Sequence, residues 1–560
     1  MKRFIITAII LSAAFSAGAQ DIYSAMGASE TNYYGTARSM ALGNAMTAMG
    51  GDLGSFGINP AGSAVSPFSQ VTITPGLTSS SNYCWYAPTF DVQTGLGNAD
   101  YGQTSTMGSK RFTMPNIGVS CYYETGRRTG IKGYTLAFVA NTTNSYLEGM
   151  SAGGTNKETS MLGAMATNAE GYTYTDLRNG YGNLNSVVAY NSGMISPYGT
   201  YTDMYWGATE TELQDADGNV FIGLAGPVSQ RSSYTVRGTR TDMLINMAAN
   251  IDDKWYVGFN IGLPMGSYHY SETFHEAAVN ESDFPLDNTN FSNAVYAYAL
   301  NRSISGIYAK VGVLGRVGKH LRLGFAAQTP SILTVEEVYR VSASTSYTNN
   351  KTDSASESSD YAYTLTTPYI LDFGLAYTMG RILFTMDYEM QDYSSMRFGA
   401  YYDDDNTNFS RVNNISRTFM GVANAWRFGI EYRLSPEFSA RFGWGNTSSP
   451  MRSYTNDFGN NVTVDDYDAY YSEYQSGKYN LFNKSKVDAT RYFTSFGVGY
   501  SSPGSFFADF AVRRTRYPQT TFMPYSDYIF DANGDIEVPS PTVKTERSLI
   551  DALVTIGWRF

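Results

Sequence analysis

Side chains that carry out catalysis or bind metals are scarce in this sequence. It has three histidines (His269, His275 and His320) and two cysteines (Cys84 and Cys121). A metal centre needs several His, Cys or carboxylate ligands together, and no such cluster surrounds these residues. No local combination of serine, histidine and a polar orienting residue indicates nucleophilic catalysis either. The sequence therefore predicts no enzyme, no catalytic residues, no metal site and no cofactor.

Two acidic segments resemble fragments of calcium-binding loops. They read Asp215-Ala-Asp217-Gly-Asn219 and Asp531-Ala-Asn533-Gly-Asp535. Neither continues with the ligand spacing and terminal glutamate of a complete loop. Because Asp-Gly and Asn-Gly pairs are common in hairpin turns, we interpret both segments as turns. Weak external cation binding is the alternative.

A third group of charged side chains alternates with large apolar ones. Its members are Arg322, Arg427, Glu431, Arg433 and Arg441. On β-strands they would share the face opposite the apolar residues, which is the interior of a barrel whose outside meets lipid. Two roles are open: contact with the polar head of a ligand, and ion pairs that stiffen the wall. The second is favoured, and Arg322, Arg427, Glu431 and Arg441 are the candidate ligand contacts.

The elements that would position these charges are strands with a period of two. The clearest runs from Trp255 to Met265, where every odd position is large and apolar. About ten residues alternating in this way are enough to cross a membrane as a tilted strand. No later window is long and apolar enough for a transmembrane helix. Aromatic residues make up 15% of the chain, which is typical of the aromatic girdles of membrane barrels.

The period-two pattern predicts fourteen strands. Their expected ranges are 69–84, 112–124, 131–146, 232–249, 254–270, 302–316, 319–334, 361–379, 381–395, 421–434, 437–448, 489–501, 504–516 and 547–560. Short and long connections alternate along this series. Outer-membrane barrels have short periplasmic turns, long external loops and an even strand number. We therefore expect an all-β, fourteen-stranded antiparallel transmembrane barrel, residues 69–560, in the bacterial outer membrane.

Both ends of the chain carry signals of export and membrane assembly. Residues 1–19 read as a signal peptide: a basic start, an apolar run and small residues up to Ala19. The last expected strand alternates and ends on Phe560, which resembles the signal read by the barrel-assembly machinery. An even strand number places both the N- and C-termini in the periplasm. The net charge of −11 argues against a nucleic-acid partner.

The segment before the barrel, residues 20–68, is expected inside the lumen as a plug. A fourteen-stranded barrel is wider than the eight-stranded kind that side chains alone can fill. We expect a short helix over residues 36–49, ended by Gly50 and Gly51. Asn59-Pro60-Ala61-Gly62 follows as a rigid bend, because Pro60 lacks an amide hydrogen and restricts the residue before it.

Several segments resemble the FadL/TodX family of outer-membrane transporters for hydrophobic compounds. The N-terminal match is "GTARSMALGNAMTAMGGDLGSFGINPAGSA", residues 35–64. Further matches are "LGFAAQTPSIL", "DYEMQDYSSMRF", "WRFGIEYRLSPEFSARFGWG" and "GVGYSSPGSFFADFAV". The resemblance implies that residues 20–68 form a hatch whose Asn59, Pro60, Ala61 and Gly62 take part in gating. It also implies lateral release of ligand at a kink in the third strand.

This resemblance predicts passive uptake of hydrophobic small molecules, such as long-chain fatty acids, with release into the membrane. Haem and aromatic hydrocarbons are other possible cargoes. The expected partners are such a ligand, outer-membrane lipid and lipopolysaccharide, and the barrel-assembly machinery; the expected state is a monomer. The alternative function is a general porin or a surface adhesin-like barrel in which the plug is only structural.

Overall fold

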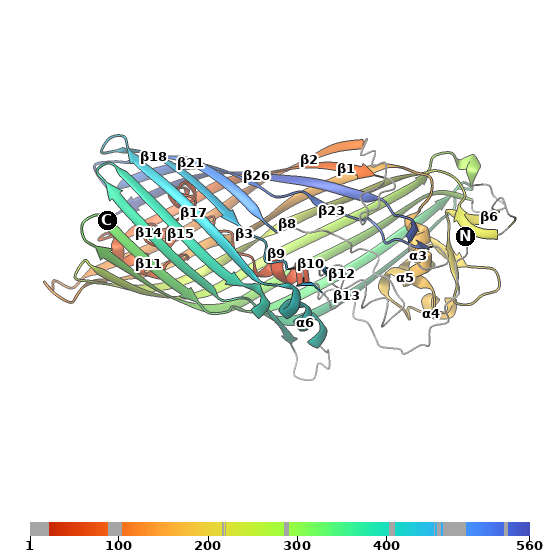
Figure 1. The fold of residues 1–560 in the computed structure, drawn as a ribbon, viewed down its shortest axis with the longest axis horizontal. Helices are drawn as coiled ribbons and strands as arrows, with labels where there is room; N and C mark the ends of the chain where they lie inside the picture. The colour runs from red at the N-terminus through yellow and green to blue at the C-terminus, as the bar shows by residue number, and fades with distance from the viewer. Residues whose placement is uncertain are drawn as a thin grey trace.

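The wall of the molecule is a closed antiparallel β-barrel of 14 strands, as predicted (Figure 1). The structure, a computed structural model, describes residues 22–87, 103–214, 218, 220–284, 290–401, 409–452, 454–455, 461–462, 489–530 and 536–560. The expected signal peptide and the aspartates of both calcium-loop-like segments lie outside the described residues.

Ten wall strands are continuous, and four positions in the wall are each filled by two consecutive strands. The continuous strands are β1 (Gln70–Ala87), β2 (Gln103–Glu124), β3 (Ile131–Asn156), β8 (Val228–Ile251), β9 (Trp255–Ala278), β10 (Phe291–Val317), β17 (Val422–Arg433), β18 (Phe438–Thr447), β21 (Arg491–Ser501) and β26 (Thr542–Arg559). The divided ones are β11 (Leu321–Gln328) with β12 (Ile332–Tyr347), β13 (Thr352–Thr366) with β14 (Ile370–Met379), β15 (Ile382–Asp392) with β16 (Arg397–Ala400), and β22 (Phe506–Arg516) with β23 (Thr520–Phe522). Pairing of β1 with β26 closes the barrel.

The short connections gather at the end of the barrel where the chain terminates, on the left of Figure 1. One connection that we predicted to be long is short. The seventh strand is predicted to end at 334 and the eighth to begin at 361. In the structure, β12 and β13 both extend further and meet at a turn at residues 348–351. The outer face of the residues between carries a single large apolar side chain, that of Val338, so a search for apolar alternation could not recognise them as strand.

The wall continues far beyond the apolar band that the sequence revealed. On β9 the outward residues Trp255, Val257, Phe259 and Met265 are exposed and apolar. Beyond Met265 the outward positions are polar, and the strand continues to Ala278. At about 3.3 Å a residue, and with the usual tilt, the apolar stretch is sufficient for a hydrocarbon band of about 25 Å. The outer half of β9 therefore projects past that band.

Prolines interrupt two strands that we predicted to be continuous. Pro330 lies between β11 and β12, and Pro368 lies between β13 and β14. Proline cannot donate a hydrogen bond to a ladder, so the strands break there. Neighbouring groups bridge the interruption: the Thr367 amide donates to the Ser331 carbonyl at 2.9 Å, and the Ser331 amide donates to the Thr367 hydroxyl at 2.9 Å.

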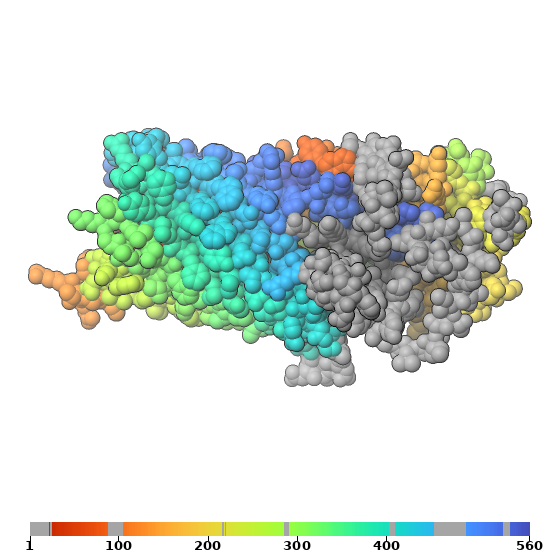
Figure 2. Space-filling model, in the orientation of Figure 1, coloured from red at the N-terminus to blue at the C-terminus, as the bar shows by residue number. Residues whose placement is uncertain are grey.

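A small helical cap covers the end with the long loops. It contains α3 (Met161–Ala169), α4 (Tyr174–Arg178), α5 (Leu184–Asn191) and the short strands β4 (Ile195–Pro197), β5 (Tyr205–Gly207), β6 (Glu210–Gln214) and β7 (Val220–Leu224). Its apolar core packs on inward residues of the wall such as Phe274 and Tyr296. Figure 2 shows the cap residues, in yellow and orange, at the opposite end from the short turns.

None of the described helices is long and apolar enough to cross a membrane.

Candidate functional site

The N-terminal segment forms a compact body inside the barrel. It contains α1 (Ile22–Ser29), α2 (Ala37–Ala41) and the 3-10 helices η1 (Leu53–Ser55) and η2 (Pro60–Val65). The expected helix over 36–49 starts correctly, with Thr36 as its N-cap, but it ends at Ala41. Gly43 and Asn44 follow with φ of 65° and 57°, a left-handed conformation that ends a helix. The described chain begins at Ile22 in the interior, among wall and loop residues rather than at the short turns.

The Asn59-Pro60 bend proves to be the start of η2. The Asn59 side chain accepts a hydrogen bond from the Ala61 amide at 3.0 Å, which caps the helix, and Pro60 occupies its first position. The Asn59 Nδ2 donates to the Thr47 carbonyl at 2.7 Å and to the Val313 carbonyl of β10 at 3.2 Å. Asn59 therefore joins two parts of the N-terminal segment to the wall.

The three residues after Asn59 are also buried. The Pro60 carbonyl accepts a hydrogen bond from Asn246 Nδ2 of β8 at 3.1 Å. Ala61 packs in an apolar cluster with wall side chains that include Leu314. The Gly62 carbonyl accepts from the Gly51 amide at 2.8 Å, and a methyl group on Gly62 would lie closer than 3.0 Å to Gly50. Asn59, Pro60 and Ala61 thus lie at one contact between the segment and the wall, while Gly62 packs within the segment beside them.

A ring of wall glycines receives the N-terminal segment. At each of them an added methyl group would lie closer than 3.0 Å to an atom of that segment. We call this set the glycine collar: Gly118, Gly258, Gly312, Gly324, Gly374, Gly429, Gly443 and Gly497. Its members come from eight different wall strands, so close contact extends around most of the barrel. At these eight strands an apolar ligand has no room to pass between the segment and the wall.

Polar wall side chains satisfy the peptide groups of the N-terminal segment. Asn260 Nδ2 donates to the Phe56 carbonyl at 2.7 Å, and the Thr385 hydroxyl donates to the Ala45 carbonyl at 2.7 Å. The amide and hydroxyl of Thr47 both donate to Asp387 Oδ2, at 2.8 and 2.7 Å. Because a buried peptide group without a partner is costly, these contacts hold the segment at a fixed depth.

The candidate ligand contacts mostly hold the N-terminal segment or each other. Arg38 of α2 pairs with Glu431 of β17 at 3.1 Å, and Arg441 of β18 pairs with the same carboxylate at 2.6 Å. Arg441 also pairs with Asp509 of β22. Arg322 donates to the Met49 carbonyl at 3.1 Å. These contacts support the structural role that the sequence favoured.

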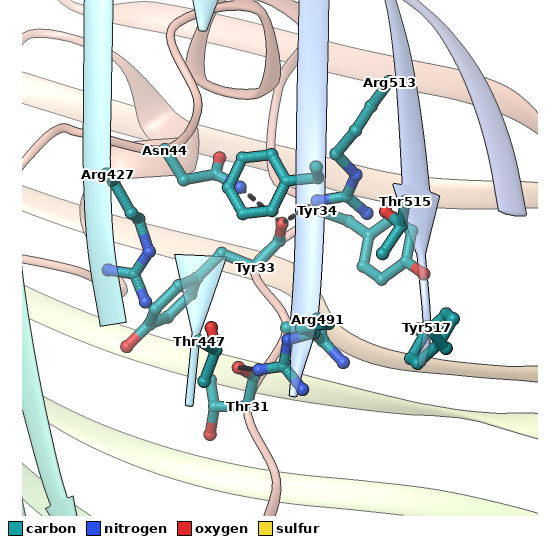
Figure 3. A pocket seen from close by; sticks show the side chains of 12 residues that line it. Thr31, Tyr33, Tyr34, Asn44, Arg427, Thr447, Arg491, Arg513, Thr515 and Tyr517 are labelled. Carbon is teal, nitrogen blue, oxygen red and sulfur yellow. Dashed lines mark hydrogen bonds between the residues drawn. The ribbon is translucent and has the colours of Figure 1, made fainter. Parts of the chain in front are cut away.

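The fourth candidate, Arg427, borders a small polar cavity beside the N-terminal segment (Figure 3). It pairs with Glu389 at 2.8 Å, while Arg513 pairs with Asp551 at 3.0 Å and donates to the Tyr33 carbonyl. The cavity measures about 20 Å³. Because one water molecule needs roughly 10–15 Å³, this cavity is a water-sized space rather than a ligand site. Arg433 lies exposed near a short turn, not in the lumen.

The wall divides between β2 and β3. Their pairing runs from Glu124 and Gly133 to Asn116 and Asn141 and then stops. Beyond it, the described part of β2 pairs with β1, and β3 pairs with β8. The division begins where β3 has a register shift at Thr143.

The outer half of β3 leaves the cylinder and lies against the inner face of β1 and β2. Asn82 Nδ2 of β1 donates to the Gly149 carbonyl at 2.7 Å, and Arg111 Nη1 of β2 donates to the Tyr146 carbonyl at 3.3 Å. The N-terminal segment contacts the same kink. The Asn32 amide donates to the Thr143 carbonyl at 2.6 Å, and the Tyr34 amide donates to the Thr142 carbonyl at 3.1 Å.

Among the described residues, no three His, Cys, Asp or Glu side chains gather into a metal-binding group. No protein-family model and no curated protein matches this sequence.

Solved structures similar to this chain include two toluene transporters and a FadL homologue. The toluene transporter TodX of P. putida is 10% identical, with a TM-score of 0.45 over 94% of this chain and 98% of that one. A FadL homologue from Pseudomonas aeruginosa is 12% identical, with a TM-score of 0.46 over 94% and 99%. The toluene transporter TbuX of Ralstonia pickettii is 14% identical, with a TM-score of 0.41 over 94% and 98%. These names belong to the family that the sequence resembles.

Two parts of the site were not predicted from the residues. The glycine collar has a signal, since glycines recur at inward positions of strands such as "RFGIEY" and "VGFNIG". Glycine weakens a strand interior, so its recurrence on one face indicates a close backbone approach. The division between β2 and β3 has no such local signal, because it arises from pairing between strands.

Proposed function

We propose that this barrel takes up hydrophobic small molecules at the outer surface and releases them sideways into the outer membrane. Residues 20–68 act as the hatch, residues 69–560 as the barrel, and the short turns face the periplasm. The observation that carries the proposal is the division of the wall between β2 and β3, next to the N-terminal segment.

The direct route along the barrel axis is filled. The glycine collar contacts the hatch at eight wall strands, and the cavity beside Tyr33 is water-sized. The periplasm is aqueous, so a hydrophobic ligand has a higher free energy there than in hydrocarbon. Each Å² of apolar surface that leaves water lowers this free energy by about 25 cal/mol. A lateral route through the divided wall leads to hydrocarbon instead, so passive transfer needs no energy coupling.

The kink and the hatch are linked by hydrogen bonds. Asn32 and Tyr34 bond to the backbone of β3 at Thr142 and Thr143, where the extra residue sits. A ligand that displaces this part of the hatch frees the kink, and a movement of β3 changes the opening beside β2. This coupling gives Asn59, Pro60, Ala61 and Gly62 a role in gating, since they hold the other end of the hatch.

Deletion of Thr143 tests the lateral route. Removing the extra residue lets the register of β3 run on and pairing with β2 extend beyond Asn116. We expect normal barrel assembly, shown by heat-modifiable migration, and loss of uptake of a radiolabelled long-chain fatty acid or toluene by cells. Deletion of one residue in the turn at 348–351 is the matched control, because it shortens the chain outside the hatch and the kink.

Unchanged uptake after deletion of Thr143 would refute lateral release. Conductance in planar bilayers tests the alternative function, because a porin conducts ions steadily. We expect the intact protein to conduct little, since the hatch fills the lumen. Large steady conductance of the wild-type protein would favour the porin, and retained surface adhesion without uptake would favour the adhesin.

A further inference from the structure

A chain of tyrosines lines the inner face of the outer half of the barrel. Tyr234, Tyr270, Tyr298 and Tyr339 come from β8, β9, β10 and β12, so each lies on the strand beside the last. Their ring centroids are separated by 5.7, 6.1 and 6.3 Å in that order. The first three are half-buried rather than fully buried. Tyr298 packs against the apolar core of the helical cap, and on β9 Tyr270 lies beyond the apolar stretch that ends at Met265.

Glu272 of β9 lies in the middle of the first three rings. It is directly opposite Tyr234 on β8 and directly opposite Tyr298 on β10. Tyr270, two residues away on the same face of β9, donates a hydrogen bond to Glu272 Oε2 at 2.9 Å. Directly opposite residues have side chains about 5 Å apart, so three tyrosines surround this carboxyl group.

Glu272 differs from the neighbouring carboxylates by having no cation. Glu148 pairs with Arg547 at 2.9 Å, and Glu337 pairs with Arg302. Within the described chain, Glu272 takes part in no ion pair, and its hydrogen bond comes from Tyr270 alone. Glu272 is half-buried. A carboxylate that is withdrawn from water is normally paired, so a positive charge from elsewhere would complete its surroundings.

We propose that Glu272 and the rings of Tyr234, Tyr270 and Tyr298 bind an organic cation, an amine or quaternary ammonium group. Aromatic faces attract such groups through their quadrupole, and the carboxylate supplies the opposite charge. A metal ion would not fit as well, because it needs several oxygen or nitrogen ligands rather than rings. This site lies on the outer half of the wall, away from the kink of β3, so it does not depend on lateral release.

The site should respond to pH. The titratable groups that face Glu272 are Tyr234 from β8, Tyr270 from its own strand, and Tyr296 and Tyr298 from β10. Burial raises the pKa of Glu272 to about 7. The carboxyl group is then mostly protonated at pH 6 and mostly ionised at pH 8. Because a cation binds the ionised form, its affinity should rise roughly tenfold between these values.

The experiment measures binding of phenyltrimethylammonium to the purified full-length protein in non-ionic detergent by isothermal titration calorimetry. Tert-butylbenzene, a neutral molecule of the same shape, is the matched ligand. We expect the cation to bind at pH 8, with about tenfold weaker binding at pH 6 and at least tenfold weaker binding of the neutral molecule. Glu272→Gln should weaken cation binding at least tenfold and remove its pH dependence.

A second variant and a control separate the cage from a general effect of charge. Tyr298→Leu should weaken binding of the cation several-fold but keep the pH dependence, because Glu272 remains. Glu336→Gln removes an exposed carboxylate from β12 and should change nothing. Equal binding of the cation to wild type and Glu272→Gln, equal binding of the two ligands, or no measurable binding would each overturn the proposal. Deletion of Thr143 should leave binding intact, which separates this inference from the proposed transport.

Discussion

Substitution of Asn59 tests which contacts hold the hatch against the wall. Asn59→Ala removes the cap of η2, worth about 1 kcal/mol. It also removes the hydrogen bonds to the Thr47 and Val313 carbonyls, at 2.7 and 3.2 Å, each worth about 1 kcal/mol. Losing a total of about 3 kcal/mol should make the locally open state about 100-fold more populated in the variant than in the wild type.

Asn59→Asp separates the cap from the two hydrogen bonds that Asn59 Nδ2 donates. Aspartate still accepts from the Ala61 amide, so the cap remains. Its carboxylate, however, faces the Thr47 and Val313 carbonyl oxygens, which need a donor. An unpaired buried charge costs more than a missing bond, so we expect Asn59→Asp to open more than Asn59→Ala. Acidic pH should partly reverse the effect, because a protonated carboxyl group donates one hydrogen bond.

Hydrogen exchange followed by mass spectrometry measures this opening. Peptides that cover η1 and η2 should exchange about 100-fold faster in Asn59→Ala and faster still in Asn59→Asp. Peptides from the outer half of β9 serve as the internal reference and should not change. The reasoning would be refuted if the aspartate variant exchanged like the wild type, or if both variants accelerated exchange throughout the barrel.

Three further variants test neighbouring contacts. Pro60→Ala gives the backbone before η2 more conformational freedom, which should destabilise the start of η2 by about 0.5–1 kcal/mol. We expect lower uptake with heat-modifiable assembly intact. Unchanged uptake would show that the motif is only structural. Gly258→Val brings a side chain into contact with the backbone at Pro60 and Ala61 and should destabilise the seated hatch by about 1–3 kcal/mol. We expect higher conductance in planar bilayers. Unchanged conductance would contradict close packing there. Glu431→Gln leaves Arg38 without its carboxylate, so exchange at α2 should accelerate, whereas unchanged exchange would show that the pair contributes little.

Much of the wall could be predicted because lipid imposes a simple pattern on it. Alternation such as that from Trp255 to Met265 marks an outward apolar face, and the fourteen strands found this way all exist. The outer halves of the strands could not be found in the same way. Their outer faces meet water and their inner faces carry polar and aromatic residues, so the contrast between the two faces is lost, as on β9 beyond Tyr270, where the predicted strand ended.

The site was harder to predict than the wall. Asn59-Pro60 stood out because its local chemistry is unusual, and it does lie at the contact between hatch and wall. Glu272 did not stand out, because its significance depends on Tyr234 and Tyr298, which are distant in sequence and meet it only through strand register. The kink at Thr143 depends on register in the same way.

The glycine collar has a consequence for the order in which the protein assembles. Atoms of the hatch lie against the collar glycines with no clearance for a methyl group, so a finished cylinder offers no way in for a folded hatch. The hatch and the collar strands therefore reach their final packing together rather than one after the other. On this view a change at a collar glycine alters the fit of the hatch and the curvature of the wall at the same time.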